Sequence, residues 1–538
     1  MKIRLHIGIL FIATLLTLSS CEQKTKETIK ANKQPNIVFI MADDHAVAAI
    51  SAYEDWLSEI APTPNIDRIA NNGMLMYNTY NTNSICGPSR SAILTGKYSH
   101  VSGFFKNEKG GDFDGSQQTF PKLLQQGGYE TAVVGKWHLG TVPTGFDYSK
   151  VMINHGGQGT YFDTVFLENG KDTIVERERH STAQVAHDAL KWLDNGRDKD
   201  KPFMLMYQFK APHRPWTPAE EFKELFTEGD LPHPANFNDD YKGRKAASEQ
   251  WMEIANHMNR KDLKVPPKNP ESMTKWEFNK YNLYGNRAGE DWTPHDSLQG
   301  AELKNWKFQA YVKDYLRCVA GVDKAVGQML DYLDENNLTE NTIIVYTSDQ
   351  GFYLGEHGWF DKRFMYEESF RMPFMIQYPG VIEPASVNRE LLLNIDFAPT
   401  FLDFAGLAIP EDIQGTSFKK QLVNDKSAET REAVYYHYYE WPKWHNVQPH
   451  YGVRTDRYKL IHYYYSMDEW ELFDLDTDKN EMNNLYGKAG YEEITATLKQ
   501  QIKELQVEYK DDMSLEEMRE MTDVVIERVY NESNLKTK

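Results

Sequence analysis

Short, nearly continuous apolar runs recur along the chain, separated by longer polar or amphipathic segments. Such runs are typical of strands that a parallel sheet buries on both faces. Apolar residues recur at helical spacing around 183–193 and 311–333. Strands alternating with helices predict a parallel α/β sheet. The five apolar runs span residues 36–42, 130–135, 203–209, 342–348 and 373–378.

The pattern changes beyond about Phe418. Four short segments there are rich in β-branched and aromatic residues, which predicts a small antiparallel sheet. Helical spacing at 494–505 predicts a helix that covers this sheet. The four segments span 433–439, 452–455, 458–463 and 469–475. We therefore divide the chain into four parts: an N-terminal segment at 1–21, a polar stretch at 22–34, a main domain at 35–420 and a C-terminal subdomain at 421–538.

The first 21 residues have the features of a targeting segment. A positively charged start precedes an apolar run at 5–18 that is too short to span a bilayer comfortably. Leu18-Ser19-Ser20-Cys21 then resembles the cleavage box of bacterial lipoproteins, in which the cysteine is lipid-modified after export. The alternative is an ordinary secretory signal with an incidental cysteine. With a polar tether at 22–34, we expect an exported protein, lipid-anchored at Cys21 in the cell envelope, either in the periplasm or at the cell surface.

Composition narrows the possible functions. The chain has 538 residues, and its hydrophobic content of 40% is enough for a large core. Sixty lysines and arginines stand against 79 acidic residues, a net charge of −19. This balance argues against a nucleic-acid partner, because phosphate contacts need a basic surface. The three cysteines are too far apart for a disulfide framework, and Cys318 on the apolar helical segment is most simply a core residue.

Four of the five apolar runs end in polar side chains that can carry chemistry. Ligands bind beyond the carboxyl ends of parallel strands, so we expect these side chains to converge. Three carboxylates and an amide oxygen suit Ca²⁺ or Mg²⁺ and suit a soft metal poorly. Taken singly, each group has another explanation, such as a helix cap or a turn. The residues are Asp43, Asp44, Lys136, His138, His213, Asp349 and Gln350.

The segment 86–96 is the most specific in the chain. Pro88 is placed to begin a helix and Gly96 to end it. Cys86 therefore lies at a helix N-terminus, where free backbone donors and the helix dipole favour an anion. Arg90 lies one turn further on and can donate toward the same point. The alternative for Cys86 is a buried structural cysteine.

Cys-x-Pro-Ser-Arg, followed by a helix that ends in Leu-Thr-Gly, resembles the signature of the type I sulfatases, a family of the alkaline-phosphatase-like superfamily. The resemblance covers about residues 35–480 and implies an α/β hydrolytic fold with a large mixed, mostly parallel sheet flanked by helices. It implies that 35–420 is the catalytic domain. It also implies that Cys86 is oxidised before folding to formylglycine, whose hydrated aldehyde is the nucleophile. Further motifs in family order lie at 43–44, 135–140, 211–215, 347–351, 354–358 and 361–362.

The resemblance implies roles for individual residues. Arg90 would orient the formylglycine hydrate, and Lys136 and Lys362 would bind sulfate oxygens. His213 would face the leaving group and protonate its oxygen, alone or together with Lys362, and His138 would remove a proton from the hydrate. One Ca²⁺ per chain is implied, with Mg²⁺ the less fitting ion. The metal ligands would be Asp43, Asp44, Cys86, Asp349 and Gln350. The catalytic residues would be Cys86, Arg90, Lys136, His138, His213 and Lys362.

Two positions need separate comment. Gln350 stands where the family often has Asn or His, but its side-chain carbonyl is still a competent Ca²⁺ ligand. His357 lies in a Gly-Glu-His-Gly turn, and we expect it to pack or to support the site from behind.

A loop between the first two C-terminal segments is a candidate for substrate contact. Its aromatic and cationic side chains can stack on a sugar ring and hold an anionic group. A surface loop with scattered aromatic residues is the alternative. The long polar insertion at 216–310 would form a rim. The candidate substrate-binding residues are His437, Trp441, Trp444, His445 and His450.

The sequence thus predicts a sulfatase acting on carbohydrates, on oligosaccharides from polysaccharides such as ulvan or glycosaminoglycan. A maturation enzyme that generates formylglycine would be its partner. The alternatives are a phosphodiester or phosphonate monoester hydrolase of the same superfamily, and a glycan-binding lipoprotein without activity. The intact set of catalytic residues argues against the latter. Glucosamine 6-sulfate, rhamnose 3-sulfate, galactose sulfates and uronate 2-sulfate all remain open as substrates.

Overall fold

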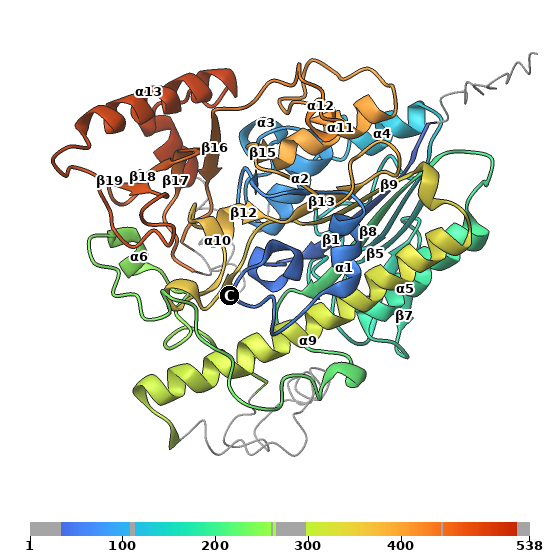
Figure 1. The fold of residues 1–538 in the computed structure, drawn as a ribbon, viewed down its shortest axis with the longest axis horizontal. Helices are drawn as coiled ribbons and strands as arrows, with labels where there is room; N and C mark the ends of the chain where they lie inside the picture. Colours follow the sequence, from blue (N-terminus) through green and yellow to red (C-terminus); the bar gives the residue numbers. More distant parts are fainter. Residues whose placement is uncertain (1–33, 108–112, 260–261, 265–296, 443–444, 524–538) are drawn as a thin grey trace, which may run out of the picture. The chain divides into compact units, whose positions relative to one another are not determined.

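A ten-stranded sheet built from strands within residues 36–388 forms the central layer of the fold (Figure 1). This computed structural model describes residues 34–107, 113–259, 262–264, 297–442 and 445–523. Its five central strands run parallel, which confirms the predicted parallel core. In sheet order the strands are β14 (Ser386–Asn388), β2 (Met74–Met76), β13 (Phe374–Gln377), β9 (Thr342–Ser348), β1 (Asn36–Asp43), β8 (Phe203–Pro212), β4 (Glu130–Gly135), β5 (Tyr148–Met152), β6 (Thr164–Glu168) and β7 (Asp172–Glu176).

The fifth apolar run forms β13, which pairs antiparallel with β9 and with β2. The strands β6 and β7 at the other end also pair antiparallel with their neighbours. The sheet is therefore mixed, as expected, with its parallel strands in the middle. An apolar run predicts that a strand is buried but carries no information about its direction, so β13 could not have been oriented from its sequence alone.

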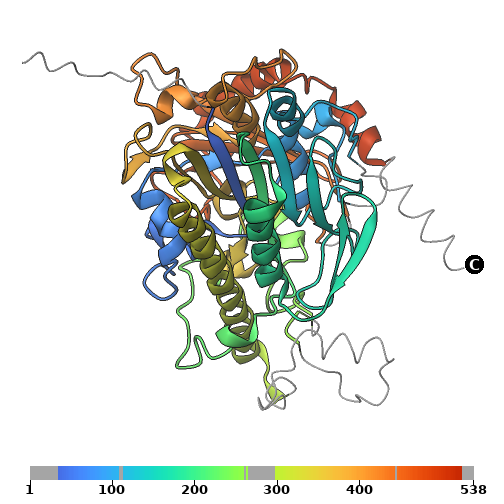
Figure 2. The same cartoon turned by 90° about the vertical axis from the view of Figure 1, so that its right-hand side faces the viewer.

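Helices cover both faces of the sheet. Successive side chains of β1 point to opposite faces and pack in two separate hydrophobic cores. Val38 and Ile40 pack in one core with residues of α5 and α9, and Figure 2 shows these two helices lying along one face of the sheet. Ile37 and Phe39 pack in the other core with residues of α2, α4 and α11. The helices are α5 (Ser181–Lys191), α9 (Gly300–Glu335), α2 (Cys86–Thr95), α4 (Phe120–Gln126) and α11 (Phe397–Phe404).

A separate four-stranded antiparallel sheet follows in the C-terminal part, as the alternating segments predict. Its strands, in order, are β16 (Ala433–Tyr438), β17 (His450–Thr455), β18 (Tyr458–Tyr463) and β19 (Glu469–Asp474). The helix α13 (Glu492–Glu508) covers it through the buried Leu498 and Ile502. The small C-terminal sheet and its helix are thus confirmed, while the boundary at residue 420 stays a prediction.

Shorter elements connect these layers. Within the described residues we find no helix that combines the length and the apolar character needed for a bilayer span. The remaining helices and strands named in Figure 1 or used below are α1 (Pro64–Asn71), α3 (Ser99–Ser102), α6 (Lys245–Glu249), α10 (Glu367–Phe370), α12 (Lys419–Leu422), β3 (Thr79–Tyr80), β10 (Tyr353–Leu354), β11 (Phe360–Asp361), β12 (Arg371–Met372) and β15 (Leu392–Leu393).

Candidate active site

The predicted site residues come from the ends of neighbouring strands. In the sheet, β9, β1, β8 and β4 lie side by side and point the same way, so their carboxyl ends meet at one edge. Asp43 is the last residue of β1, and Asp349 directly follows β9. Lys136 directly follows β4, and His213 directly follows β8. The parallel order of the strands therefore gathers these groups into one place.

Three carboxylates lie together at the centre of this edge. Asp43, Asp44 and Asp349 are fully buried, and each offers one oxygen within 4.8 Å of the others. Burial, followed by repulsion from Asp43, raises the pKa of Asp349 to about 7. Burial, with a smaller contribution from Asp43, raises the pKa of Asp44 to about 6 against the attraction of Lys362. The ionised forms of these buried acids are therefore unfavourable unless a cation compensates their negative charge.

The donor set fits a hard divalent cation. Asp43 Oδ1 and Gln350 Oε1 are buried and accept no hydrogen bond from the described residues, and Gln350 Nε2 donates to Asp44 Oδ1. Asp43 Oδ1 lies 3.5 Å from Arg90 Nη2, an ion pair without a hydrogen bond. Buried oxygen atoms that accept no hydrogen bond are suited to act as ligands of Ca²⁺ or Mg²⁺. A second group of potential ligands joins Asp43 to Cys86 and His213. Asp43, Asp44, Asp349 and Gln350 are therefore the residues that would hold such an ion.

Cationic side chains surround the carboxylates. Lys362 Nζ donates to both oxygens of Asp44 at 2.6 and 2.8 Å, and Lys136 Nζ pairs with Asp43. Arg90 Nε donates to Asp349 Oδ2 at 3.0 Å. Although burial alone would raise it, the pKa of Asp43 is held well below its usual range, chiefly by Lys136. An acidic protein thus carries a local group of cations that suits an anionic substrate.

Cys86 lies at the first turn of α2, as its local sequence predicts. The helix begins at Cys86 and ends at Thr95, and Gly96 follows in the left-handed region with φ 68°. The Cys86 thiol is 1% exposed, and its Sγ lies 3.8 Å from Asp44 Oδ1. Burial raises the pKa of this thiol well above its usual value, even though Lys362 opposes the shift. Unmodified Cys86 therefore stays neutral and is a poor nucleophile.

Two histidines face the same centre. His213 Nδ1 donates to the carbonyl oxygen of Arg214 at 2.8 Å, so its Nε2, 3.7 Å from Asp44 Oδ2, carries the free lone pair. His138 has a left-handed backbone with φ 55°, and its Nδ1 is buried without a partner among the described residues. Burial is the main cause that lowers the pKa of each imidazole well below the usual range, and the charge of Lys136 adds to it. Both rings are neutral and available to accept a proton.

Several residues at this edge escaped the sequence reasoning. Gln208 Oε1 accepts from Arg90 Nη1 at 2.9 Å, and Gln158 Oε1 accepts from Lys136 Nζ at 2.7 Å. Lys210 is 3% exposed inside β8, and burial followed by repulsion from Lys136 lowers its pKa to about 7. For two of them the sequence offered a signal, because Gln208 lies inside the apolar run 203–209 and Lys210 directly follows it.

Of the predicted substrate-binding residues, the structure brings one to the site. His445 Nε2 lies 3.1 Å from Asp361 Oδ2, next to Lys362 in sequence. His437 and His450 are fully buried in the C-terminal sheet. Both ring nitrogens of His437 bond to Asp511 and Tyr464, and those of His450 bond to backbone atoms of Gln448 and Met365. The Trp441 ring packs on the Tyr465 ring at 4.8 Å, and Trp444 lies outside the described residues.

His357 is buried in the turn where it was expected to pack. Its Nδ1 lies 2.6 Å from Asp239 Oδ2, and its Nε2 lies 3.7 Å from Glu368. Although burial lowers it, these two acids raise the pKa of His357 to about 9. The ring therefore serves an internal ion pair.

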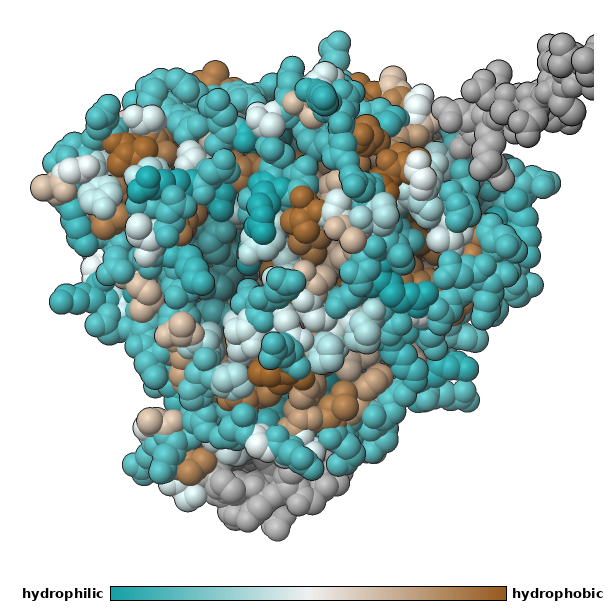
Figure 3. Space-filling view, viewed as in Figure 1, coloured by the Kyte–Doolittle hydropathy of each residue, from teal (hydrophilic) through white to brown (hydrophobic). Residues whose placement is uncertain are grey.

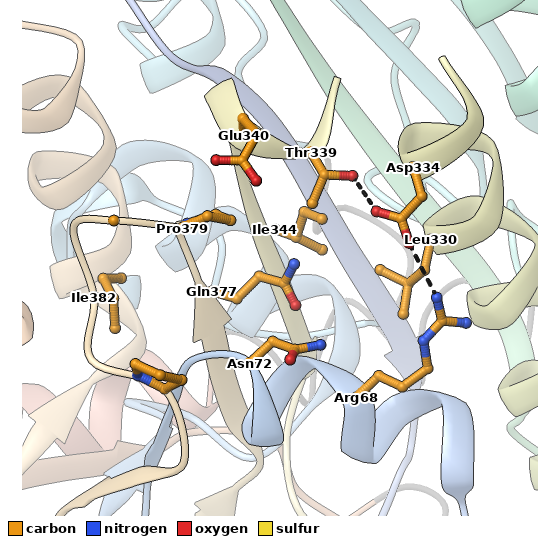
Figure 4. Close-up of a pocket in the computed structure, with 12 residues that line it drawn as sticks. Arg68, Asn72, Leu330, Asp334, Thr339, Glu340, Ile344, Gln377, Pro379 and Ile382 are labelled. Atoms are coloured by element: carbon orange, nitrogen blue, oxygen red, sulfur yellow. Dashed lines mark hydrogen bonds and ion pairs between the residues drawn. The ribbon is translucent and has the colours of Figure 1, made fainter. Parts of the chain in front are cut away.

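Two larger cavities lie elsewhere in the described structure and contain none of the predicted site residues. One, of about 380 Å³, opens between the ends of α1, α9 and β13, where Arg68 pairs with Asp334 (Figure 4). The other, of about 530 Å³, is lined partly by α10 and by Arg454 of β17. Figure 3 shows the face of the molecule that is seen in Figure 1. This face is largely hydrophilic and has a hollow beside the C-terminal sheet. Neither cavity competes with the strand-end cluster as the catalytic centre.

Comparison with known proteins agrees with this geometry. The family model described as Sulfatase matches residues 35–407, and the model described as N-sulphoglucosamine sulphohydrolase, C-terminal, matches 355–508. An N-acetylglucosamine-6-O-sulfatase of Bacteroides thetaiotaomicron is 48% identical over 514 residues, which cover 92% of this chain and 90% of that one. An ulvan-active sulfatase of Formosa agariphila is 25% identical, covering 92% of this chain and 86% of the relative.

Solved structures give the same picture. One, in complex with its substrate D-glucosamine-2-N,6-O-disulfate, has a TM-score of 0.83 and 47% identity, and covers 90% of this chain and all of its own. A phosphonate monoester hydrolase of Agrobacterium radiobacter has a TM-score of 0.65 at 18% identity, and covers 88% of this chain and 96% of its own. The second likeness concerns the fold alone.

The raised pKa values of Asp44 and Asp349 predict how stability depends on pH. In metal-free protein these acids keep protons that the unfolded chain has released, so stability falls as pH rises from about 4 to about 7. A divalent cation takes the place of those protons. We expect added Ca²⁺ to raise the urea midpoint of EDTA-treated protein more at pH 7.5 than at pH 5.

Other buried acids also contribute to the pH dependence of stability; burial raises the pKa of Glu356, for example, to about 7. A control with two variants separates the proposed cation site from these acids. Asp349→Asn should lose most of the cation response, whereas Asp456→Asn, at an exposed position, should keep it. An equal cation response at both pH values in the unsubstituted protein would contradict this assignment.

Proposed function

We propose a function from the premise that this chain belongs to the sulfatase family and is a sulfuric ester hydrolase. It removes the 6-O-sulfate of glucosamine units, N-acetylated or N-sulfated, in oligosaccharides derived from glycosaminoglycan. The relative at 48% identity and the substrate-bound structure at 47% identity support this sugar and this position. The ulvan-active relative, at 25% identity, supports the algal alternative less strongly.

One observation carries the proposal for this site. Cys86 begins a helix and lies beside a carboxylate cluster that is ringed by Lys136, Lys362 and Arg90. A sulfate ester carries negative charge on its peripheral oxygens, and its transfer requires that this charge be neutralised as the bond to the sugar oxygen breaks. A nucleophile placed among cations at a helix N-terminus meets that requirement.

The proposed nucleophile is formylglycine made from Cys86 by a maturation enzyme. The raised thiol pKa supports it, because the unmodified side chain is protonated and weakly reactive. A hydrated aldehyde supplies one hydroxyl to attack sulfur and a second whose deprotonation releases sulfate and restores the aldehyde. A plain serine at this place would be left as a stable sulfate ester.

The proposed cofactor is one Ca²⁺ per chain, with Mg²⁺ the less fitting ion. Asp43, Asp44, Asp349 and Gln350 would hold it, together with modified Cys86, and the two oxygens left without a hydrogen bond support that set. When bound, the ion makes the attacking hydroxyl more acidic and offsets charge on the sulfate group.

The remaining steps belong to the chain's own side chains. Arg90, fixed by Asp349 and Gln208, orients the hydroxyls at position 86. Lys136 and Lys362 bind the outer sulfate oxygens. His213 must first take up a proton at Nε2, which Asp43, Asp44 and the anionic sulfate group favour against the effect of burial, and it then delivers this proton to the leaving sugar oxygen. His138 accepts the proton of the second hydroxyl at position 86.

Export and anchoring complete the proposal. The segment Leu18-Ser19-Ser20-Cys21 supports lipid modification at Cys21, and the polar stretch 22–34 would serve as a tether. We expect Cys21→Ser to move the protein from the membrane fraction to the soluble fraction of fractionated cells. Recovery of this variant in the membrane fraction, as for the unsubstituted protein, would contradict lipid anchoring.

The nucleophile is tested at Cys86. We expect Cys86→Ala to lower kcat by at least about 10⁴-fold with an unchanged unfolding midpoint, because the reacting atom is lost and the fold is not. Mass spectrometry of the Cys86 peptide, from a host with the maturation enzyme, should give the mass of formylglycine. An unaltered cysteine in fully active enzyme would overturn the proposal.

The substrate is tested with a panel of sulfated sugars and released sulfate as the readout. Glucosamine 6-O-sulfates should give kcat/KM at least about 100-fold above rhamnose 3-sulfate, galactose sulfates and uronate 2-sulfate, because specificity rests on hydrogen bonds to the sugar. An aryl phosphodiester and an aryl phosphonate, assayed beside an aryl sulfate, test the rival chemistry. Faster turnover of either phosphorus ester than of the sulfate would favour a phosphonate or phosphodiester hydrolase.

A further inference from the structure

The helix that carries Cys86 lacks a side-chain cap of its own. Its N-cap residue is Ile85, which has no acceptor for the free N–H groups of the first turn. Asn107 supplies the acceptor from elsewhere in the chain, because its Oδ1 accepts from the Gly87 N–H at 2.9 Å. A Cβ at Gly87 would lie 2.6 Å from that same oxygen and 2.4 Å from the Phe104 ring. Glycine after Cys86 therefore allows Asn107 to cap the helix.

Glu440, just beyond β16, holds Asn107 in place. Its Oε2 accepts from the Asn107 backbone N–H at 2.8 Å, and its Oε1 accepts from Arg363 Nη1 at 2.6 Å. Glu440 is 1% exposed, so both contacts are made away from bulk water. One carboxylate thus joins the loop that caps the nucleophile's helix to the segment that carries Lys362.

That segment needs an anchor. Asp361 and Arg363, on either side of Lys362, both have positive φ, of 80° and 100°. Positive φ is unfavourable for side chains of this size and persists only where surrounding contacts impose it. Arg363 is held by Glu440, by the Tyr438 hydroxyl at 2.9 Å and by Asp361 Oδ1 at 3.2 Å. Lys362, between them, donates to Asp44.

We propose that Glu440 is a positioning residue for the reaction. With one oxygen it sets Asn107 at the start of the nucleophile's helix, and with the other it sets Arg363 beside Lys362. The proposal rests on the proposed function, in which Cys86 supplies the nucleophile and Lys362 binds sulfate. Glu440 acts through these neighbours, so its effect falls on how the reacting groups are aligned.

Glu440→Gln is the sharpest substitution. Glutamine keeps the shape, but its NH₂ group must face either the Asn107 N–H or the Arg363 guanidinium, so one of the two contacts is lost. We expect kcat on a glucosamine 6-O-sulfate to fall by about 10- to 100-fold, with KM changing less than kcat. Glu432→Gln, at an exposed position just before β16, is the matched control and should leave both parameters unchanged.

A second variant separates positioning from folding. Asn107→Ala removes the cap and should also lower kcat, by about tenfold. Because the two residues share one contact chain, the loss in the double variant should be smaller than the product of the two single losses. Urea unfolding and the mass of the Cys86 peptide are measured for each variant, so that kcat refers to folded, matured enzyme.

Normal kcat per folded, matured molecule in Glu440→Gln would overturn the inference, as would a rise in KM with kcat unchanged or fully multiplicative losses in the double variant. In each case an inactive Cys86→Ala leaves the proposed function standing. Full activity of Cys86→Ala would instead remove the premise itself, so the two failures are distinguishable.

Discussion

The burial of three carboxylates in one small volume is the constraint on which the structure of this site depends. Asp43, Asp44 and Asp349 have no solvent contact, and like charges so close would repel strongly without compensation. Lys136 and Lys362 provide it, with Arg90. Removing one member of such a buried pair costs about 3–5 kcal/mol, because the other charge is left uncompensated. Charge balance therefore holds the ends of β1, β4 and β9 and the start of α2 together.

The same balance prepares the site for an anion. In the structure, Lys136 and Lys362 donate to Asp43 and Asp44. If these carboxylates coordinate a cation, as proposed, their demand on the lysines weakens and the ammonium groups can turn to sulfate oxygens. A chain with a net charge of −19 repels anions at long range. Attraction for the sulfate group must then come from the short-range cations Lys136 and Lys362, which Asp43 and Asp44 hold in place.

How much the sequence predicts depends on how far apart the interacting residues lie. The start of α2 at Cys86 and its end before Gly96 follow from local signals, and the meeting of strand ends follows from parallel order. Asn107 caps α2 from 20 positions away in the sequence, and Glu440 contacts Asn107 from 333 positions away. No local sequence pattern encodes either contact. His437 was grouped with the aromatic loop, but β16 directs it inward, where pairing with Asp511 satisfies it.

The C-terminal sheet belongs to the site as much as to its own core. The Tyr436 hydroxyl, from β16, accepts from the Ser84 N–H at 3.1 Å and donates to the Arg363 carbonyl at 2.6 Å. The His437 N–H donates to the carbonyl oxygen of Thr82 at 3.2 Å. One strand thus fixes both the segment before Cys86 and the segment that carries Lys362. A change of sequence pattern near residue 420 separates two kinds of sheet, but β16 of the second sheet adds contacts to the segment before Cys86 and to the segment that carries Lys362.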